Sequence, residues 1–251
     1  MLHKVIGLFG AVFFLSGCAV VGSSKVDPSA IQTSYRASYS EQSGRLSYEA
    51  TFQVGDGFGT YVQFDDGSEV KIDSQLMVLS DTLFNQISYI ASVSSVAPGA
   101  DDLTKTHVFS YKNAQCQQGA CGTSSEIFQN SFRIPARVFI AEEQDKTASP
   151  QAAFLVHWGT SDRIQSNERI YAYISQPTTQ GGERQHSRIA SNAQGSSGVI
   201  EFAALDMANF VTGPAEVWVC REGYSSSIQS PSEGGSLSAG YCSKRVSLNI
   251  D

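Results

Sequence analysis

Charged residues are scarce in this 251-residue sequence, where Asp, Glu, Lys and Arg together make up 16%. The signatures G-x-S-x-G, G-x-x-x-x-G-K and H-E-x-x-H are absent. Their absence excludes a recognisable serine nucleophile elbow, phosphate-binding loop or zinc-protease helix. Strand patterns do not alternate with helix patterns, which excludes a βαβ architecture. We therefore expect no cofactor, and no known motif identifies a catalytic residue.

Long apolar runs are also missing. Apolar residues interrupted only by glycines cover residues 5–15, directly after Lys4, in a run of about eleven residues. A helix of that length spans about 16 Å, which is only about half of the hydrocarbon core of a bilayer. A basic residue followed by a short apolar run is typical of a signal peptide that is removed on export.

The apolar run ends in Leu15, Ser16, Gly17 and Cys18. This tetrapeptide resembles the lipobox of bacterial lipoproteins, in which a Leu and two small residues precede the Cys that is acylated. The resemblance covers only the signal segment, and it implies cleavage after residue 17 and a lipid anchor of two or three acyl chains on Cys18. The alternative is an ordinary secretory signal with a Cys at its cleavage site.

The residue after the lipidated Cys bears on which membrane holds the protein. In Gram-negative lipoproteins an Asp at that place commonly implies retention in the inner membrane. Here the place is taken by Ala19. The resemblance therefore implies the outer membrane of a Gram-negative bacterium.

The remaining chain is acidic. The first seventeen residues carry one basic and no acidic side chain, so 16 Lys and Arg remain against 24 Asp and Glu, a net charge of about −8. This balance argues against nucleic acid as a partner and against binding to anionic lipid by charge alone. With 22 Gly, 14 Phe and 10 Tyr, the composition is typical of an exported, turn-rich β protein.

Besides Cys18, the cysteines are Cys116, Cys121, Cys220 and Cys242. An even number in an exported chain predicts two disulfides. Of the three pairings, we favour the one that joins neighbours in sequence, Cys116 with Cys121 and Cys220 with Cys242. A zinc site is the alternative, but neither pair has the two-residue spacing of a zinc knuckle, so we expect no metal.

Period-two alternation of apolar and polar residues predicts short strands through most of the chain. They are expected at residues 46–54, 60–64, 68–72, 86–93, 106–111, 131–141, 152–158, 169–175, 199–203, 215–221 and 244–250. Pro135 is expected at a strand start or edge, because it has no N–H to donate. A single helical turn is expected at 203–210.

This pattern predicts an all-β fold, an antiparallel β-sandwich that we interpret as two immunoglobulin-like domains. After the signal peptide at 1–17, small polar residues predict a flexible tether over 18–44. The first domain is expected at 45–112, a connecting loop at 113–130 and the second domain at 131–251. One larger sandwich or barrel is the alternative.

Candidates for chemistry are few. His107, His157 and His186 have no second His or carboxylate at metal-ligand spacing, and we interpret them as surface or hydrogen-bonded strand residues. Acidic turns such as DDGSE at 65–69 favour hairpins over calcium sites, because Asp and Gly both tolerate a positive φ. A triad assembled from distant residues would make the protein an exported hydrolase, which is the alternative function.

Candidates for binding are tyrosines. Tyr171 and Tyr173 alternate with aliphatic residues, so if the aliphatic face is buried the tyrosines face solvent, where they bind a partner or only cover their own sheet. Residues 223–241, rich in Gly and Ser, are expected as a long loop closed by the second disulfide. Its Tyr224 and Tyr241 would supply contact area.

These observations favour a lipid-anchored protein of the cell envelope, in the outer membrane, with a non-enzymatic binding or structural role. Its expected partner is an envelope protein or a glycan, bound through Tyr171, Tyr173, Tyr224 and Tyr241. An exported hydrolase with a dispersed active site is the second hypothesis.

Replacement of the lipid acceptor tests the anchor. Cys18→Ala removes the only thiol at the cleavage site, so we expect acyl labelling to be lost and the protein to stay uncleaved or to leave the membrane fraction. Metabolic labelling with a fatty acid and envelope fractionation measure both effects. Unchanged labelling and membrane partitioning would contradict the lipoprotein interpretation.

Overall fold

The computed structural model describes residues 20–55, 59–81, 86–112, 127–190, 195–225, 227–230 and 234–251. Strands hold 57% and helices 7% of these residues, so the protein is mostly β, as expected. The expected signal peptide and Cys18 lie outside the described residues, as do Cys116 and Cys121. No helix in the described ranges is long and apolar enough to cross a bilayer.

The strands form one large sheet and two small ones. The large sheet contains β1 (Val20–Gly22), β2 (Ile31–Ser40), β3 (Arg45–Val54), β4 (Thr60–Gln63), β7 (Val78–Asp81), β8 (Ile87–Val93), β12 (Thr147–Ala148), β14 (Glu168–Pro177), β15 (Glu183–Ile189), β17 (Gly213–Ser225), β18 (Gly235–Cys242) and β19 (Val246–Ile250). Its main order is β1-β4-β3-β2-β18-β17-β14-β15, with β8 and β7 beyond β3 and with β19 and β12 beyond β17.

The four-stranded sheet has the order β10-β9-β5-β6, and the three-stranded sheet has the order β11-β13-β16. Their strands are β5 (Glu69–Ile72), β6 (Gln75–Leu76), β9 (His107–Lys112), β10 (Ile127–Phe132), β11 (Val138–Ile140), β13 (Phe154–Thr160) and β16 (Ser197–Phe202). The short helices are η1 (Ser23–Lys25), η2 (Pro28–Ala30), α1 (Asp101–Thr104) and α2 (Ala204–Met207).

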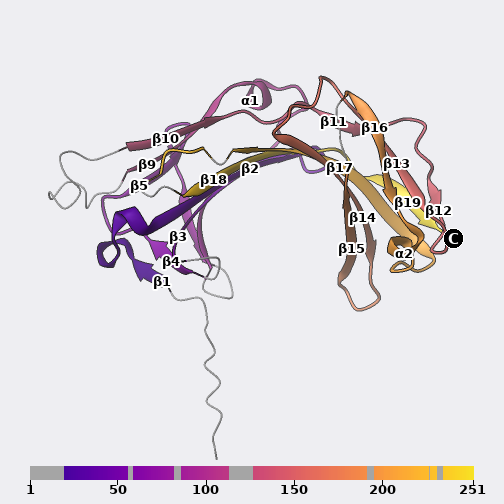
Figure 1. Ribbon diagram of the computed structural model, residues 1–251, viewed down its shortest axis with the longest axis horizontal. Helices are drawn as coiled ribbons and strands as arrows, with labels where there is room; N and C mark the ends of the chain where they lie inside the picture. Colours follow the sequence, from indigo (N-terminus) through magenta and orange to yellow (C-terminus); the bar gives the residue numbers. More distant parts are fainter. Residues whose placement is uncertain are drawn as a thin grey trace, which may run out of the picture.

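The large sheet is an arch (Figure 1). Strands β2, β18 and β17 run along its crown, and β3 with β4 and β14 with β15 form its two legs. The small sheets lie on the convex side. Tyr35 of β2 stacks on Phe109 of β9 with ring centroids 4.7 Å apart, and Val138 and Val156 of the three-stranded sheet join the same buried cluster as Val219 of β17. The concave side of the large sheet is left facing solvent.

The alternation of apolar and polar residues explains which face of each strand is buried. In β3, Leu46, Tyr48, Ala50 and Phe52 are buried and the residues between them are more exposed. The expected strands at 46–54, 86–93, 106–111, 152–158, 169–175, 199–203, 215–221 and 244–250 are confirmed within a few residues, and α2 confirms the helical turn. These strands carry enough apolar or aromatic residues for the period to show in sequence.

The expected flexible tether is wrong for residues 31–40. They form β2, which pairs antiparallel with β3 and parallel with β18. Its buried positions alternate with exposed ones, but the buried set contains Thr33 and Ala37 beside Tyr35 and Tyr39. Because small and hydroxylated residues fill both faces, the strand resembles a polar linker when only hydrophobicity is counted.

The expected long loop at 223–241 is also wrong over most of its length. Strand β17 continues to Ser225 and β18 begins at Gly235, and the two pair antiparallel. Leu237, Ala239 and Tyr241 of β18 are buried. The Ser and Gly between them have low strand propensity, so the loop interpretation followed composition where the pairing with β2 and β17 decides the structure.

Two further expectations are corrected. The sheets are not purely antiparallel, because β1 with β4, β12 with β19 and β18 with β2 pair in parallel. Residues 127–132, expected partly as connecting loop, form β10 on β9. The strand expected at 131–141 is divided into β10 and β11 around Pro135, because proline cannot donate to a ladder. The domain boundaries at 112 and 131 stay predictions.

The second disulfide is confirmed: Cys220 of β17 and Cys242 of β18 are directly opposite each other and are bonded. The bond lies where β17 changes partner. Residues Gly213 to Val217 of β17 pair with β19, and Cys220 to Ser225 pair with β18. The disulfide therefore links β18 to β17 at the point where the partner of β17 changes from β19 to β18.

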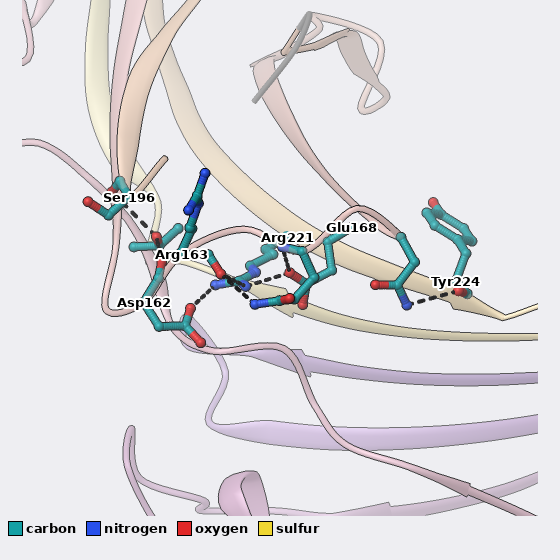
Figure 2. Close-up of polar contacts among 9 residues, drawn as sticks. Asp162, Arg163, Glu168, Ser196, Arg221 and Tyr224 are labelled. Atoms are coloured by element: carbon teal, nitrogen blue, oxygen red, sulfur yellow. Dashed lines mark hydrogen bonds and ion pairs between the residues drawn. The ribbon is translucent and has the colours of Figure 1, made fainter. Parts of the chain in front are cut away.

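A buried arginine fixes the same strand from its convex side. Arg221 is 1% exposed, and its guanidinium binds the carboxylates of Asp162 and Glu168 and, at 3.1 Å, the carbonyl of Arg163 (Figure 2). Glu168 also accepts the backbone N–H of Gln165 at 2.7 Å. One cation of β17 thus holds the segment that connects β13 to β14.

A second polar contact joins the crown of the arch to the three-stranded sheet. Glu41 follows β2, and its buried carboxylate accepts from the guanidinium of Arg137 at 2.7 Å and from the hydroxyl of Tyr241 at 3.2 Å. Its backbone N–H donates to the carbonyl of Cys242 at 2.9 Å. Because Arg137 stands just before β11, this contact ties β2 and β18 to the three-stranded sheet.

Loss of the buried guanidinium is expected to destabilise the fold strongly. Arg221→Ala leaves the Glu168 carboxylate, whose side chain is 11% exposed, without its cation. We expect the free energy of unfolding, measured in urea, to fall by about 3 kcal/mol. Arg163→Ala is the matched control, since only the backbone carbonyl of Arg163 binds Arg221, and should change it by less than about 0.5 kcal/mol. Equal losses in both variants would contradict the assigned role.

Candidate functional site

The small sheets lie on the convex side of the large sheet and leave its concave face uncovered (Figure 1). Along β17, Val217, Val219 and Arg221 point into the core, so Trp218 and Cys220 between them point to the concave side. The same alternation places serines and arginines of β2 and β3 on this side. A wide polar surface with aromatic side chains on one leg results.

An aromatic cluster occupies the leg formed by β14 and β17. It consists of Tyr171 and Tyr173 on β14 and Trp218 and Tyr224 on β17. Tyr173 lies directly opposite Trp218, and their rings stack with centroids 5.2 Å apart and planes 9° apart. The rings of Tyr171 and Tyr173 are 6.4 Å apart, and the hydroxyls of Tyr171 and Tyr224 are 3.1 Å apart.

Arg245 closes the other side of the cluster. Its guanidinium lies 4.4 Å from the centroid of the Trp218 ring and binds Glu216 at 2.8 Å. Trp218 is therefore held between a tyrosine and a cation and is only 8% exposed, whereas Tyr224 is 40% exposed. The stack is rigid, and Tyr224 is the member most open to a partner.

The phenols of the cluster act as donors. Burial raises the pKa of Tyr224, and its hydrogen bonds to Glu222 and Tyr171 raise this pKa further. Burial and the Glu222 carboxylate also raise the pKa of Tyr173. Because the hydroxyl of Tyr224 donates to Glu222, Tyr171 is left to donate to Tyr224. With a raised pKa, the hydroxyls of Tyr173 and Tyr224 stay protonated at neutral pH.

A groove lies on the other leg of the same face. Its volume is about 590 Å³. The side chains that define its character are Arg36, Arg45, Glu49, Leu76, Val78 and Ile90. We refer to it as the arginine groove.

The groove and the aromatic cluster belong to one row of the sheet. Residues directly opposite one another across six strands are Val78, Ile90, Glu49, Arg36, Ser238 and Tyr224. Strands lie about 4.8 Å apart, so Arg36 and Tyr224 are separated by about 10 Å. Glu222 bridges this interval, because it binds Tyr224 and lies 3.9 Å from Arg36. An extended ligand across the strands would contact both.

Two of the histidines, His107 and His186, are engaged by neighbouring groups. His107 is fully buried, with Nδ1 2.7 Å from Asp73 and Nε2 2.7 Å from the carbonyl of Asp102. His186 contacts Asp206, which Arg188 also binds. Among the described residues no group of three metal-ligating side chains is brought together.

The sequence-predicted binding residues divide into two groups. Tyr171, Tyr173 and Tyr224 are brought together on the concave face. Tyr241 is 2% exposed and lies against Tyr39 with ring centroids 4.9 Å apart. Its assignment to partner binding is wrong, because its strand position places it on the buried face beside Glu41.

Sequence reasoning missed Trp218, Arg245, Arg36 and Glu222. Trp218 and Glu222 stand two residues on either side of Cys220, so alternation along β17 would have placed them on its face. Arg36 lay in the segment read as tether. Arg245 gave no signal, because its contact with Trp218 depends on how β19 pairs with β17.

The sequence matches no protein-family model and no curated protein. Among solved structures, a DUF4785 family protein from Legionella pneumophila is 12% identical over 76% of this chain and 51% of its own, with a TM-score of 0.26. The FN1–FN3 domains of chicken CNTN1 are 12% identical over 84% of this chain and 67% of theirs, with a TM-score of 0.21. This chain thus spans about half the length of the Legionella structure. Backbone similarity at this level carries no functional argument.

Proposed function

We propose that this protein is a lipid-anchored, non-enzymatic component of the outer membrane that binds an envelope partner, a protein or a glycan, on its concave face. The observation that carries the proposal is the aromatic cluster, in which Tyr171, Tyr173, Trp218 and Tyr224 project from the uncovered side of the arch. The lipid on Cys18 is part of the proposal and rests on the lipobox.

We also propose that the body consists of two immunoglobulin-like sandwiches that share the large sheet. One would pair β2, β3 and β8 with the four-stranded sheet. The other would pair β15, β14, β17 and β19 with the three-stranded sheet. The support is the burial of aromatic residues between the layers of the first and of aliphatic residues between the layers of the second.

A binding role is favoured over a purely structural one for the tyrosines. Tyr224 keeps 40% of its surface exposed, so covering the sheet does not account for its orientation. Its hydroxyl and that of Tyr171 form a hydrogen-bonded pair on a rigid support. Rigid aromatic groups with a polar end give contact area at a small cost in conformational entropy.

His107 and His186 give the hydrolase alternative no such support. A general base has to reach the proton that it removes. His107 is 0% exposed and has partners on both ring nitrogens, and His186 is engaged by Asp206. We therefore do not extend the proposal to catalysis.

Substitution in the aromatic cluster tests the proposed function. The double variant Tyr171→Ser, Tyr224→Ser removes both members of the hydroxyl pair, and we expect capture of the partner from intact envelopes by crosslinking to fall by about tenfold or more. Phe139→Ser is the matched control, since Phe139 is 37% exposed on β11. Membrane anchoring and the circular dichroism spectrum should stay unchanged. Undiminished capture by the double variant would remove this face from consideration.

A further inference from the structure

The arginine groove combines two surfaces that the aromatic cluster lacks. One wall carries two guanidinium groups, and the other carries aliphatic side chains that face solvent. The groove lies on the far leg of the same concave face. Its chemistry indicates what class of ligand reaches this end.

The cationic wall has donors to spare. The side chain of Arg36 is 64% exposed, and its ion pair with Glu222 is long, at 3.9 Å. Arg45 donates to the hydroxyl of Ser92 at 2.9 Å, and no ion pair forms between it and any described carboxylate. Among the described residues that line the groove, Glu49 is the only acidic one. Two guanidinium groups against this one carboxylate give the described lining a net charge of about +1, with the Glu222 carboxylate just outside it, although the whole chain carries a net charge of −7.

The aliphatic wall is unusually exposed. Leu76, Val78 and Ile90 are 59%, 67% and 41% exposed, and Val78 and Ile90 are directly opposite each other on β7 and β8. Adjacent exposed aliphatic side chains typically mark an interaction surface. Within the described part of the chain, β7 pairs only with β8, so its other edge offers backbone N–H and C=O groups to a ligand.

We infer that the arginine groove binds an extended, acidic polypeptide segment of the partner, an inference that rests on the proposed function of the concave face. Carboxylates of the segment bind Arg36 and Arg45, and its aliphatic side chains pack on Leu76, Val78 and Ile90. The charge of the groove is complementary to such a segment. The backbone of the bound segment is within reach of the edge of β7.

The aliphatic wall is what selects a polypeptide over a glycan. Burial of aliphatic side chains against one another removes apolar surface from water on both partners. A sugar presents hydroxyls along its edge, and these would lose hydrogen bonds to water against Val78 and Ile90 without gaining partners. The groove therefore fits alternating acidic and aliphatic side chains better than a polysaccharide.

A defined peptide tests this inference on the full mature chain. The probe is a short fluorescein-labelled peptide of alternating Glu and Val, and its binding is followed by fluorescence anisotropy. We expect saturable binding that weakens as salt rises, and a loss of about tenfold in affinity for Arg36→Gln and for Arg45→Gln. Val78→Ser should weaken it as well. The matched controls are Arg133→Gln and Leu205→Ser, which change exposed residues outside the groove.

Charge reversal keeps the test independent of folding. The double variant Arg36→Glu, Arg45→Glu should bind a Lys-Val peptide and lose the Glu-Val peptide. No binding of the Glu-Val peptide, equal binding of both peptides to the unchanged chain, or stronger binding of a neutral oligosaccharide or of anionic lipid vesicles would overturn the inference.

The two proposals fail separately. If envelope capture depends on Tyr171 and Tyr224 but the Glu-Val peptide does not bind, the inference about the groove is wrong and the proposed function stands. If the peptide binds through Arg36 and Arg45 but capture of the envelope partner does not depend on Tyr171 and Tyr224, the inference about the groove holds and the assignment of the aromatic cluster is wrong.

Discussion

Backbone pairing along both edges of β17 is the constraint on which the rest of the structure depends. One edge pairs with β14, and the other pairs first with β19 and then with β18. Because β18 in turn pairs with β2, a single strand connects the C-terminal leg of the arch to the N-terminal one. Arg221 on the buried side and the Cys220–Cys242 disulfide on the other fasten this connection where the partner changes.

The candidate binding surface follows from that connection. The side chains of β17 that point away from the core include Trp218, Glu222 and Tyr224, and the row through Tyr224 continues over β18 to Arg36 on β2. Without the pairing of β18 with β2, the aromatic cluster and the arginine groove would lie on separate sheets. The arch thus places the aromatic cluster and the arginine groove on one surface, which is long enough for an extended partner.

The sequence predicted most strands whose alternation involves apolar or aromatic residues, such as β3 with Leu46 and Phe52, and it placed Tyr171 and Tyr173 on the outer face. It missed β2 and β18, where Ser, Thr, Gly and Ala occupy most positions and propensity favours a loop. These two strands are neighbours, and their pairing joins residues about two hundred positions apart. No local pattern reports such a pairing, which is why the tether and the role of Tyr241 were misassigned and the groove was not foreseen.

Native-state hydrogen exchange of residues 20–251 tests most directly whether β17 couples the two legs. If it does, the most protected backbone amides of β2 and β14 exchange through one global opening, with free energies that agree within about 0.5 kcal/mol. If instead β2 and the four-stranded sheet open at a free energy lower than β14 and β19 by about 2 kcal/mol or more, the legs fold as independent units. That result would contradict a single sheet held together by β17.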